Sequence, residues 1–334
     1  SVGDTWQASG QNKLVSCLLL CAELGRGSSL WQDHTMERLT YSPIINRPRL
    51  ELPNGARVAL WVCPNIEHYE YLPDPVRLRD PWPRMPHPDI LGYGLKDYGN
   101  RVGLWRMFDV MDHFDVRCTV SLNLSVFEHY PEIMAACEER GWDVLCHGIY
   151  NTQYLWGLDE PAERAIIEEC VDTYRRLTGR QLPGWFSPAA SHTLNTPDLV
   201  AEAGIKYYAD WVHDDQPGPM NVRRGRLLTV PYSMELNDAV LHNRAQEADD
   251  FLVMIKDYFD TVYAEGAEQP RIMCLALHPY MMGQPHRIGY LEQALDYILS
   301  HDGVWQATGE EIADWYYAEM WDKVTAHLGG DDNA

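Results

Sequence analysis

Side chains that can exchange protons follow several apolar segments of this chain. Glu67 comes soon after the first such segment, His147 directly after the third and His278 directly after the seventh. A carboxylate and two histidines can accept and donate protons near neutral pH, which is the chemistry of general acid–base catalysis. A single histidine in such a position is more often structural than catalytic, so these residues matter only if the fold brings them together.

The apolar segments have the composition of buried strands. They lie at residues 57–63, 117–122, 142–146, 184–186, 206–209, 227–230, 272–277 and 304–307. Stretches with apolar residues at helical spacing lie between them, at 101–114, 131–140, 160–178, 196–203, 247–265 and 287–300. Strands that alternate with helices predict a parallel sheet of the α/β class, and about seven such units predict a single distorted (β/α)7-type barrel.

An open, doubly wound sheet is the alternative architecture. No Gly-x-Gly-x-x-Gly follows the first strand, so a dinucleotide site has no support. In a parallel barrel the active site lies at the carboxyl ends of the strands, where Glu67, His147 and His278 would converge. Further candidates follow the same strand ends, namely Asn65, Tyr150, Asn151, Ser187, Asp210, Trp211, Glu235 and Asn237.

The composition indicates which partners and which cell compartment to expect. A formal net charge of −22 would repel the phosphates of nucleic acid, so we expect no nucleic-acid partner. The apolar run at residues 14–22 is too short to cross a bilayer, so we expect no membrane partner. Eight cysteines lie scattered without zinc-finger spacing, which favours reduced thiols and a cytoplasmic location.

The chain divides unequally along its length. We expect residues 1–35 to be a disordered extension, 36–325 to be the barrel and 326–334 to be a disordered tail. Residues 71–100 carry six prolines interleaved with aromatic residues, and so long a loop in a compact domain is usually functional. This loop is either an arm at a subunit interface or a wall over the pocket.

The order of the strand-end motifs resembles that of the polysaccharide deacetylase superfamily, whose members share the NodB-homology barrel. The motifs are Asn65-Ile-Glu67, His147-Gly-Ile-Tyr-Asn151, Phe186-Ser187-Pro188, Asp210-Trp211 and Leu275-Ala-Leu-His278. Residues 98–106 and 231–238 are especially similar to the metal-independent branch of allantoinases and cyclic-imide hydrolases. The resemblance covers roughly residues 51–317 and implies a homo-oligomer, a dimer or a tetramer.

The resemblance implies a metal site that this chain has altered. Metal-dependent deacetylases hold a divalent ion with one carboxylate and two histidines, and the matching positions here are Glu67, His147 and Asn151. An amide oxygen is a weak ligand for transition metals. Asn65 stands where the family has its usual base, and Phe186 replaces an arginine. We therefore expect no cofactor, with a divalent metal such as Zn²⁺ as the alternative.

Without a metal the substrate must itself be activated. A ring imide, hydantoin or ureide is a better electrophile than an acetamide, so we expect a hydrolase of non-peptide C–N bonds that opens a cyclic amide, imide or ureide. In this hypothesis Glu67 accepts a proton from water, and His278 or His147 protonates the leaving nitrogen or stabilises the oxyanion.

The remaining candidates would bind the substrate. Amide side chains both donate and accept hydrogen bonds, which suits Asn65, Asn151 and Asn237 to its polar edges, while Trp211 and Tyr150 would supply an apolar wall. Two other hypotheses remain open. One is that the chain is a metal-dependent N-deacetylase of a sugar or small amide. The other is that it is an inactive barrel that binds a carbohydrate or metabolite.

Overall fold

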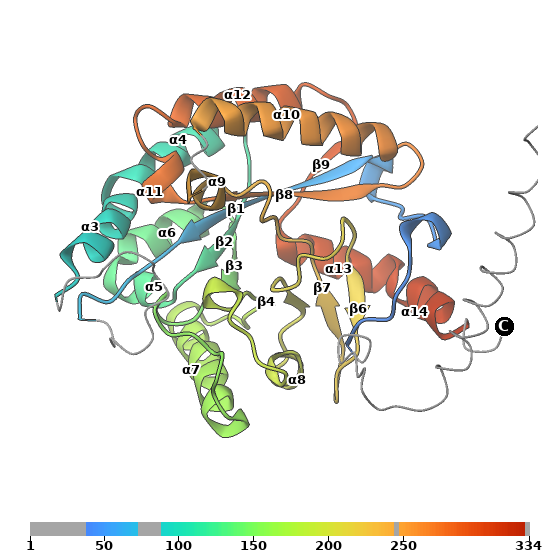
Figure 1. Ribbon diagram of the computed structural model, residues 1–334, viewed down its shortest axis with the longest axis horizontal. Coiled ribbons are helices and arrows are strands. Elements are labelled where there is room, and N and C mark those ends of the chain that lie inside the picture. Colours follow the sequence, from blue (N-terminus) through green and yellow to red (C-terminus); the bar gives the residue numbers. More distant parts are fainter. Residues whose placement is uncertain (1–37, 73–87, 244–246, 331–334) are drawn as a thin grey trace, which may run out of the picture. The chain divides into compact units, whose positions relative to one another are not determined.

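A mostly parallel sheet, curled into a half-barrel and surrounded by helices, carries the candidate residues (Figure 1). The computed structural model describes residues 38–72, 88–243 and 247–330. Nearly all of them belong to one compact unit that begins at Tyr41. The sheet follows the order β6 (Gly218–Met220), β7 (Leu227–Thr229), β5 (Tyr207–Tyr208), β4 (Gly184–Trp185), β3 (Asp143–Cys146), β2 (Thr119–Leu122), β1 (Val58–Ile66) and β8 (Arg271–Leu277).

Strand β1 is the hub of the sheet. It pairs with β8 from Val58 to Pro64, with β9 (Val304–Gln306) at its amino end and with β2 at Asn65 and Ile66. Every residue of β1 is buried, as expected for a parallel strand covered on both faces. Glu67 follows this strand directly, so its backbone is anchored by the best-paired part of the sheet.

The two ends of the sheet, β6 and β8, do not pair with each other, and the described segments beside β6 and β7 contact β8 through single backbone hydrogen bonds. The amide of Ile272 in β8 donates to the carbonyl of Asp215 at 2.9 Å, and that of Ala276 donates to Leu236 at 2.9 Å. Irregular segments thus fill the gap between the two strands. The predicted barrel of parallel strands is confirmed in this half-open form.

Large side chains fill the interior beneath the strand ends. Trp61 in β1 meets the rings of Tyr207 and Tyr232 edge-on, at centroid distances of 6.5 and 6.3 Å. Phe186 lies against Tyr232 with ring centroids 4.4 Å apart. The interior is therefore a packed core, and the polar candidates lie above it.

Helices connect and cover the strands, and most match the predicted ranges. They are α3 (Ile90–Tyr98), α4 (Leu104–His113), α5 (Ser125–His129), α6 (Pro131–Glu139), α7 (Glu160–Thr178), α8 (Thr196–Glu202), α9 (Asp238–Asn243), α10 (Ala248–Glu265), α11 (Pro279–Met282), α12 (Ile288–Leu299), α13 (Gly309–Glu319) and α14 (Trp321–Gly330). The helix α7 begins at an Asp159 cap and ends at Gly179, whose φ of 71° is the left-handed conformation expected there.

Three predictions of local structure need correction. The helix predicted at 101–114 is preceded by a π-helical turn (Gly99–Gly103) and by α3, so part of the predicted loop 71–100 is helical. The short strand β6 was missed, and it pairs antiparallel with β7. Residues 326–330, predicted as part of a disordered tail, complete α14. The predicted extension 1–35 and residues 331–334 lie outside the described residues.

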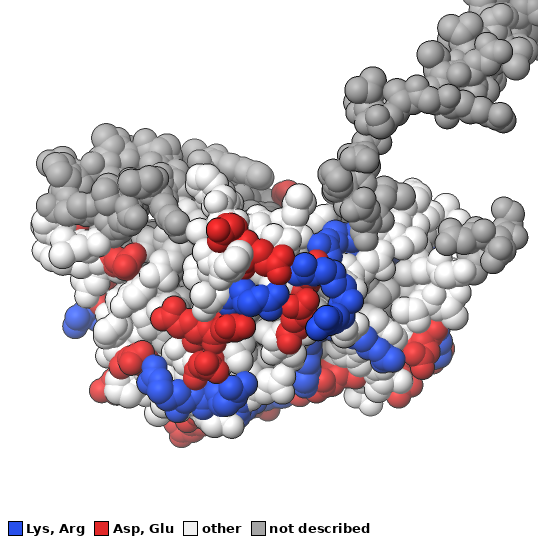
Figure 2. All heavy atoms as spheres, turned by 90° about the horizontal axis from the view of Figure 1, so that it is seen from below, with Lys and Arg blue, Asp and Glu red and all other residues white. Residues whose placement is uncertain are grey.

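The described chain is rich in surface ion pairs despite its net negative charge. Figure 2 shows basic and acidic side chains intermixed on the face that it views. Arg164, for example, lies 2.8 Å from Glu202, and Lys206 lies 2.8 Å from Glu310. Among the described residues no helix is long and apolar enough to cross a membrane. The six cysteines in this part of the chain are free and buried.

Candidate active site

Glu67 is a buried carboxylate between two cationic side chains. Its Oε1 lies 3.5 Å from His278 Nε2, and its Oε2 lies 3.7 Å from Lys96 Nζ. Burial alone would raise the pKa of Glu67, but the Lys96 ammonium, the bond to His278 and the charge of His147 lower that pKa to about 2. Glu67 is therefore ionised at neutral pH and is a weak base.

His278, which follows β8, is held between two carboxylates. Its Nδ1 lies 2.7 Å from Asp238 Oδ1, and its backbone N–H donates to Asp238 Oδ2 at 2.9 Å. Burial lowers the pKa of His278, but Asp238 and Glu67 raise it further, to about 9. The ring is therefore an imidazolium at neutral pH, and it can donate a proton or stabilise negative charge.

His147, which follows β3, has the opposite character. Its Nδ1 lies 2.8 Å from the carbonyl oxygen of Phe186, and its ring stacks on the Phe186 ring with centroids 4.7 Å apart. Burial lowers the pKa of His147 below its ordinary value. The ring is thus neutral at neutral pH. With Nδ1–H donating to the carbonyl, Nε2 carries the lone pair of a base.

The predicted convergence of these three side chains is what the structure shows. Glu67 contacts His278 directly and is close enough to His147 for each charge to shift the pKa of the other. One strand-end cluster thus contains an imidazolium acid, a neutral imidazole base and a carboxylate. Residues whose environments move their pKa values apart are the usual basis of acid–base assignments in enzymes.

The amides of Asn65 and Asn237 have partners within the protein. Asn65 Nδ2 donates to the carbonyls of Leu277 at 3.2 Å and Cys63 at 3.4 Å, and its Oδ1 accepts from Tyr232 Oη at 3.0 Å. Asn237 Oδ1 accepts two backbone N–H groups at 3.1 Å in the first turn of α9. Both amides therefore brace β1, β8 and α9, and their contact with substrate stays a prediction.

Asn151 and Tyr150 lie on the loop after β3, beside the segment that follows β1. Asn151 Nδ2 donates to Tyr69 Oη at 2.7 Å, while its Oδ1 is buried without a hydrogen-bond partner among the described residues. Tyr150 lies against His68 with centroids 5.2 Å apart, and its hydroxyl lies 3.3 Å from His129 Nε2. Asn151 thus offers a spare acceptor beside the segment that follows β1, whereas Tyr150 belongs to an aromatic cluster.

Asp210 organises the strand ends of β4 and β5. Its Oδ1 accepts the backbone N–H of Ser187 at 2.7 Å, and its Oδ2 accepts Tyr208 Oη at 2.7 Å. His192 Nδ1 lies 3.4 Å from the same Oδ2, and Trp211 stacks on His192 with centroids 5.8 Å apart. Asp210 and Ser187 therefore support the neighbourhood of His147, and the negative charge of Asp210 acts to raise the His147 pKa.

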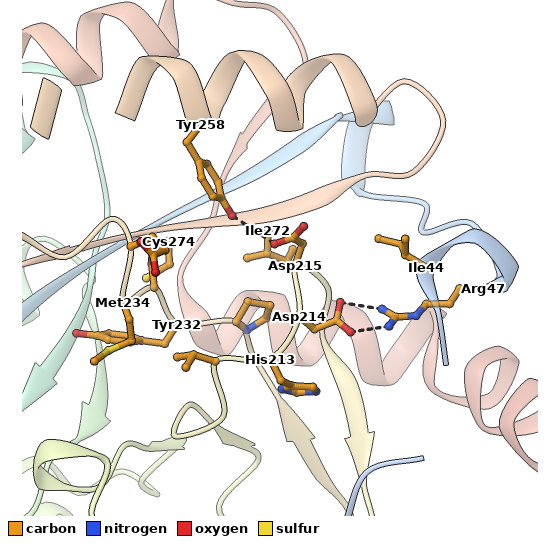
Figure 3. A pocket seen from close by; sticks show the side chains of 14 residues that line it. Ile44, Arg47, His213, Asp214, Asp215, Tyr232, Met234, Tyr258, Ile272 and Cys274 are labelled. Atoms are coloured by element: carbon orange, nitrogen blue, oxygen red, sulfur yellow. Dashed lines mark hydrogen bonds and ion pairs between the residues drawn. The ribbon is translucent and has the colours of Figure 1, made fainter. Parts of the chain in front are cut away.

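Glu235 lines a separate pocket of about 470 Å³. Figure 3 shows this pocket with its neighbour Met234 labelled. The lining of this pocket includes Tyr232, Met234, Asp215 and Tyr258 but none of the three acid–base residues. The cause is local: the segment after β7 crosses to β8 with Leu236 buried, which leaves Glu235 exposed. Glu235 thus lines a different pocket from the one expected, and its contact with substrate stays a prediction.

The residues present do not fit a catalytic divalent metal. No group of three or more His, Cys, Asp or Glu side chains in the described part of the chain is arranged to hold one. Of the positions that match the family's ligands, Asn151 contributes only a neutral amide oxygen. Glu67 already faces two cationic groups, and these would repel a divalent ion.

Two residues that contact the acid–base cluster were missed from the sequence. Lys96 lies in the segment predicted as a loop, where glycines at 92 and 94 hid the helical spacing of α3. Asp238 was passed over in favour of Asn237, although a carboxylate in the first turn of a helix beside a strand-end histidine can orient that histidine. No local pattern shows that residue 96 reaches residue 67.

The sequence of this chain is similar to those of several known proteins. A family model described as Polysaccharide deacetylase matches residues 96–208. A Schizosaccharomyces pombe protein named "Putative polysaccharide deacetylase" is 30% identical over 260 residues, which cover 72% of this chain and 80% of that protein. A Helicobacter pylori "Peptidoglycan deacetylase" is 24% identical over 261 residues, or 68% of this chain and 87% of that protein.

The solved structures include similar folds. The crystal structure of PuuE allantoinase superposes with a TM-score of 0.73 at 28% sequence identity. The match covers 84% of this chain and 99% of that chain.

Proposed function

Because the chain belongs to the polysaccharide deacetylase family, whose named relatives are hydrolases of non-peptide C–N bonds, we propose that it hydrolyses a cyclic amide, imide or ureide without a catalytic metal. The similarity to PuuE allantoinase supports a ring substrate.

One observation carries the proposal. Glu67 Oε2 and Asn151 Oδ1 are buried acceptors without a hydrogen-bond partner among the described residues, and the other oxygen of Glu67 lies 3.5 Å from the protonated His278. Buried polar atoms without partners are rare and call for an explanation. The N–H groups of a ureide or imide would satisfy these acceptors, while its carbonyl oxygen would face the imidazolium.

The three ionisable side chains divide the reaction between them. His147 Nε2 accepts a proton from water as the water oxygen attacks the carbonyl carbon. His278 stabilises the resulting oxyanion and then gives its proton to the leaving nitrogen as the C–N bond breaks. The ring opens to a carboxylic acid and a free nitrogen on one product, and a proton from His147 returns through solvent to His278.

This division changes the role that the sequence suggested for Glu67. A general base works best when its pKa is near the working pH. The pKa of about 2 makes Glu67 a poorer base than the neutral His147. We therefore assign proton abstraction to His147, and we assign to Glu67 the task of holding His278 protonated and oriented.

An activated ring makes this chemistry feasible. A plain acetamide needs strong stabilisation of its oxyanion, which a metal usually provides. Imide and ureide carbonyls lie between electron-withdrawing nitrogens or carbonyls, so their oxyanions need less stabilisation. General acid–base groups each accelerate a reaction about 10²–10⁴-fold, and an acceleration of this size suits such a substrate.

The test is a ring-opening assay on the purified chain. Allantoin, hydantoin, succinimide and an N-acetylated sugar are each incubated with and without a chelator, and the metal content is measured. We expect chelator-insensitive opening of at least one ring, abolished in His147→Gln. Chelator-sensitive deacetylation of the sugar would support the metal-dependent alternative, and binding without turnover would support an inactive ligand-binding barrel.

Two further expectations stay predictions. We propose a homo-oligomer, a dimer or a tetramer, which sedimentation analysis of the purified protein tests. We also propose a cytoplasmic location and a small-molecule substrate, with neither nucleic acid nor membrane as a partner.

A further inference from the structure

We propose that the Lys96 ammonium is the built-in cation of this site and supplies the positive charge that a divalent metal supplies in metal-dependent relatives. The inference deepens the proposed function, since it concerns the same site. It concerns a residue outside the strand-end motifs, contributed by the helix that precedes the π-helical turn.

Lys96 is fixed by three contacts. Its Nζ lies 3.7 Å from Glu67 Oε2, 3.4 Å from the centroid of the Tyr280 ring and 4.8 Å from that of Tyr69. The side chain is only 13% exposed. Cation–π contacts strengthen when the cation is desolvated, so the aromatic rings hold the ammonium on the carboxylate.

Close packing of glycines brings Lys96 to this place. A side chain at Gly99 would come within 2.8 Å of the Tyr280 backbone, and one at Gly103 would overlap the Pro279 carbonyl. The π-helical turn therefore lies directly on α11, the helix that follows His278. Single π-turns inside helices are frequent at functional sites.

A hydrogen bond ties the same turn to Glu67. Asn100 Nδ2 donates to the Glu67 backbone carbonyl at 3.0 Å, and Asn100 is buried. The turn thus fixes the position of the glutamate backbone through Asn100, and α3, which precedes the turn, places Lys96 opposite the carboxylate.

The charges balance in a way that suits a metal-free site. A divalent ion would need a further anionic or imidazole ligand, but Asn65 and Asn151 are neutral at the matching positions. Lys96 and His278 instead place two positive charges against the two carboxylates of Glu67 and Asp238. With Asp238 paired to His278, the Lys96 ammonium balances the charge of Glu67, and both cations favour the oxyanion that forms during hydrolysis.

The test compares three variants. Lys96→Met removes the charge with little change of volume, and Lys96→Arg keeps it. Lys256→Met is the matched control, because Lys256 Nζ also lies over a tyrosine ring, Tyr297, at 4.8 Å but belongs to α10 and not to this site. We expect kcat for ring opening to fall about 100-fold in Lys96→Met with KM changed less than threefold, and to stay unchanged in Lys256→Met.

Two further measurements separate charge from structure. Added ethylamine should restore part of the activity of Lys96→Met, and Lys96→Arg should retain more activity than Lys96→Met. A loss of kcat that neither ethylamine nor arginine relieves, with Lys96→Met folded as wild type, would overturn the proposal.

A titration with Zn²⁺ decides the matter even if no ring substrate is turned over. If Lys96 holds the place of a metal charge, its removal should strengthen Zn²⁺ binding about tenfold or more, and Glu67→Gln in the Lys96→Met background should abolish the gain. Equal Zn²⁺ affinity in wild type and Lys96→Met would contradict the role of Lys96. Absence of ring opening with a clear gain in affinity would contradict only the proposed function.

Discussion

His278 and Asp238 form a double contact in which one carboxylate binds both the ring and the backbone of the histidine. Asp238 Oδ1 lies 2.7 Å from His278 Nδ1, and Asp238 Oδ2 accepts the His278 N–H at 2.9 Å. The geometry fixes which ring nitrogen faces Glu67. It resembles the orienting carboxylate of other acid–base sites, since it sets both the direction and the charge of the imidazole.

Replacing Asp238 with asparagine should shift the pH dependence of the reaction. The carboxylate is the largest influence that raises the pKa of His278, so its removal should lower that pKa from about 9 toward 6.5. The alkaline limb of the kcat profile should then move to lower pH, while the acid limb, set by His147, should move little. Steady-state rates from pH 5 to 10 check this, and an unmoved alkaline limb would show that His278 is not the acid.

Stability should depend on pH through the same cluster. Because His278 has a raised pKa in the fold, its contribution is complete below about pH 6.5 and is lost as pH rises through about 9. Because Glu67 has a lowered pKa, its contribution is complete above about pH 4.5 and is lost as pH falls toward 2. Both contributions are present together between these limits.

Urea unfolding of wild type and His278→Gln measures the histidine part. The difference in unfolding free energy should be largest near pH 6 and should shrink by pH 9.5. A difference that does not change with pH would mean that the histidine stabilises the fold by packing alone.

The glycine contacts can be tested with a matched pair of substitutions. In Gly103→Ala the new methyl group would overlap the Pro279 carbonyl, which should destabilise the fold by about 1–3 kcal/mol and displace α11 together with His278. Gly94→Ala in α3 meets nothing within 4 Å and should stabilise the helix by roughly 0.5–1 kcal/mol. Thermal unfolding and kcat are measured for both variants. Equal changes in stability and kcat in the two variants would contradict the close contact between Gly103 and α11.

The bracing role of Asn65 predicts a modest cost for removing its partner. Tyr232→Phe would leave Asn65 Oδ1 buried without the hydroxyl that lies 3.0 Å away, so we expect a loss of about 1 kcal/mol in unfolding free energy. The ring contacts of Tyr232 with Trp61 and Phe186 are preserved in this variant. A loss well above this estimate would indicate that Asn65 also positions the reacting groups.

The parts of the site that the sequence predicted are those set by strand ends. Glu67, His147 and His278 follow buried parallel strands, and the carboxyl ends of such strands meet at one edge of the sheet whatever the connecting helices do. Glu235 and Asn237 follow a strand too, but their segment crosses a gap in the barrel. Whether each side chain faces inward there depends on pairing with β8, which sequence spacing does not report.

The parts that could not be predicted depend on close approach between distant segments. Lys96 reaches Glu67 because Gly99 and Gly103 let one turn lie on the backbone of another. The six prolines of residues 71–100 made the same region resemble a loop, and Gly92 and Gly94 weaken the helical pattern at its end. The role of Gly99 and Gly103 can be recognised only when the backbone that they contact is known.

The pairing of β1 on both edges also affects how the chain opens. Residues near Val58 lie between β8 and β9, and Asn65 and Ile66 pair with β2 beside the end of the β8 ladder. Their amide hydrogens should exchange with deuterated solvent only when the whole unit unfolds, whereas those of edge strand β6 should exchange by local opening. The carboxylate at the centre of the site is thus attached to the last segment of the chain to open.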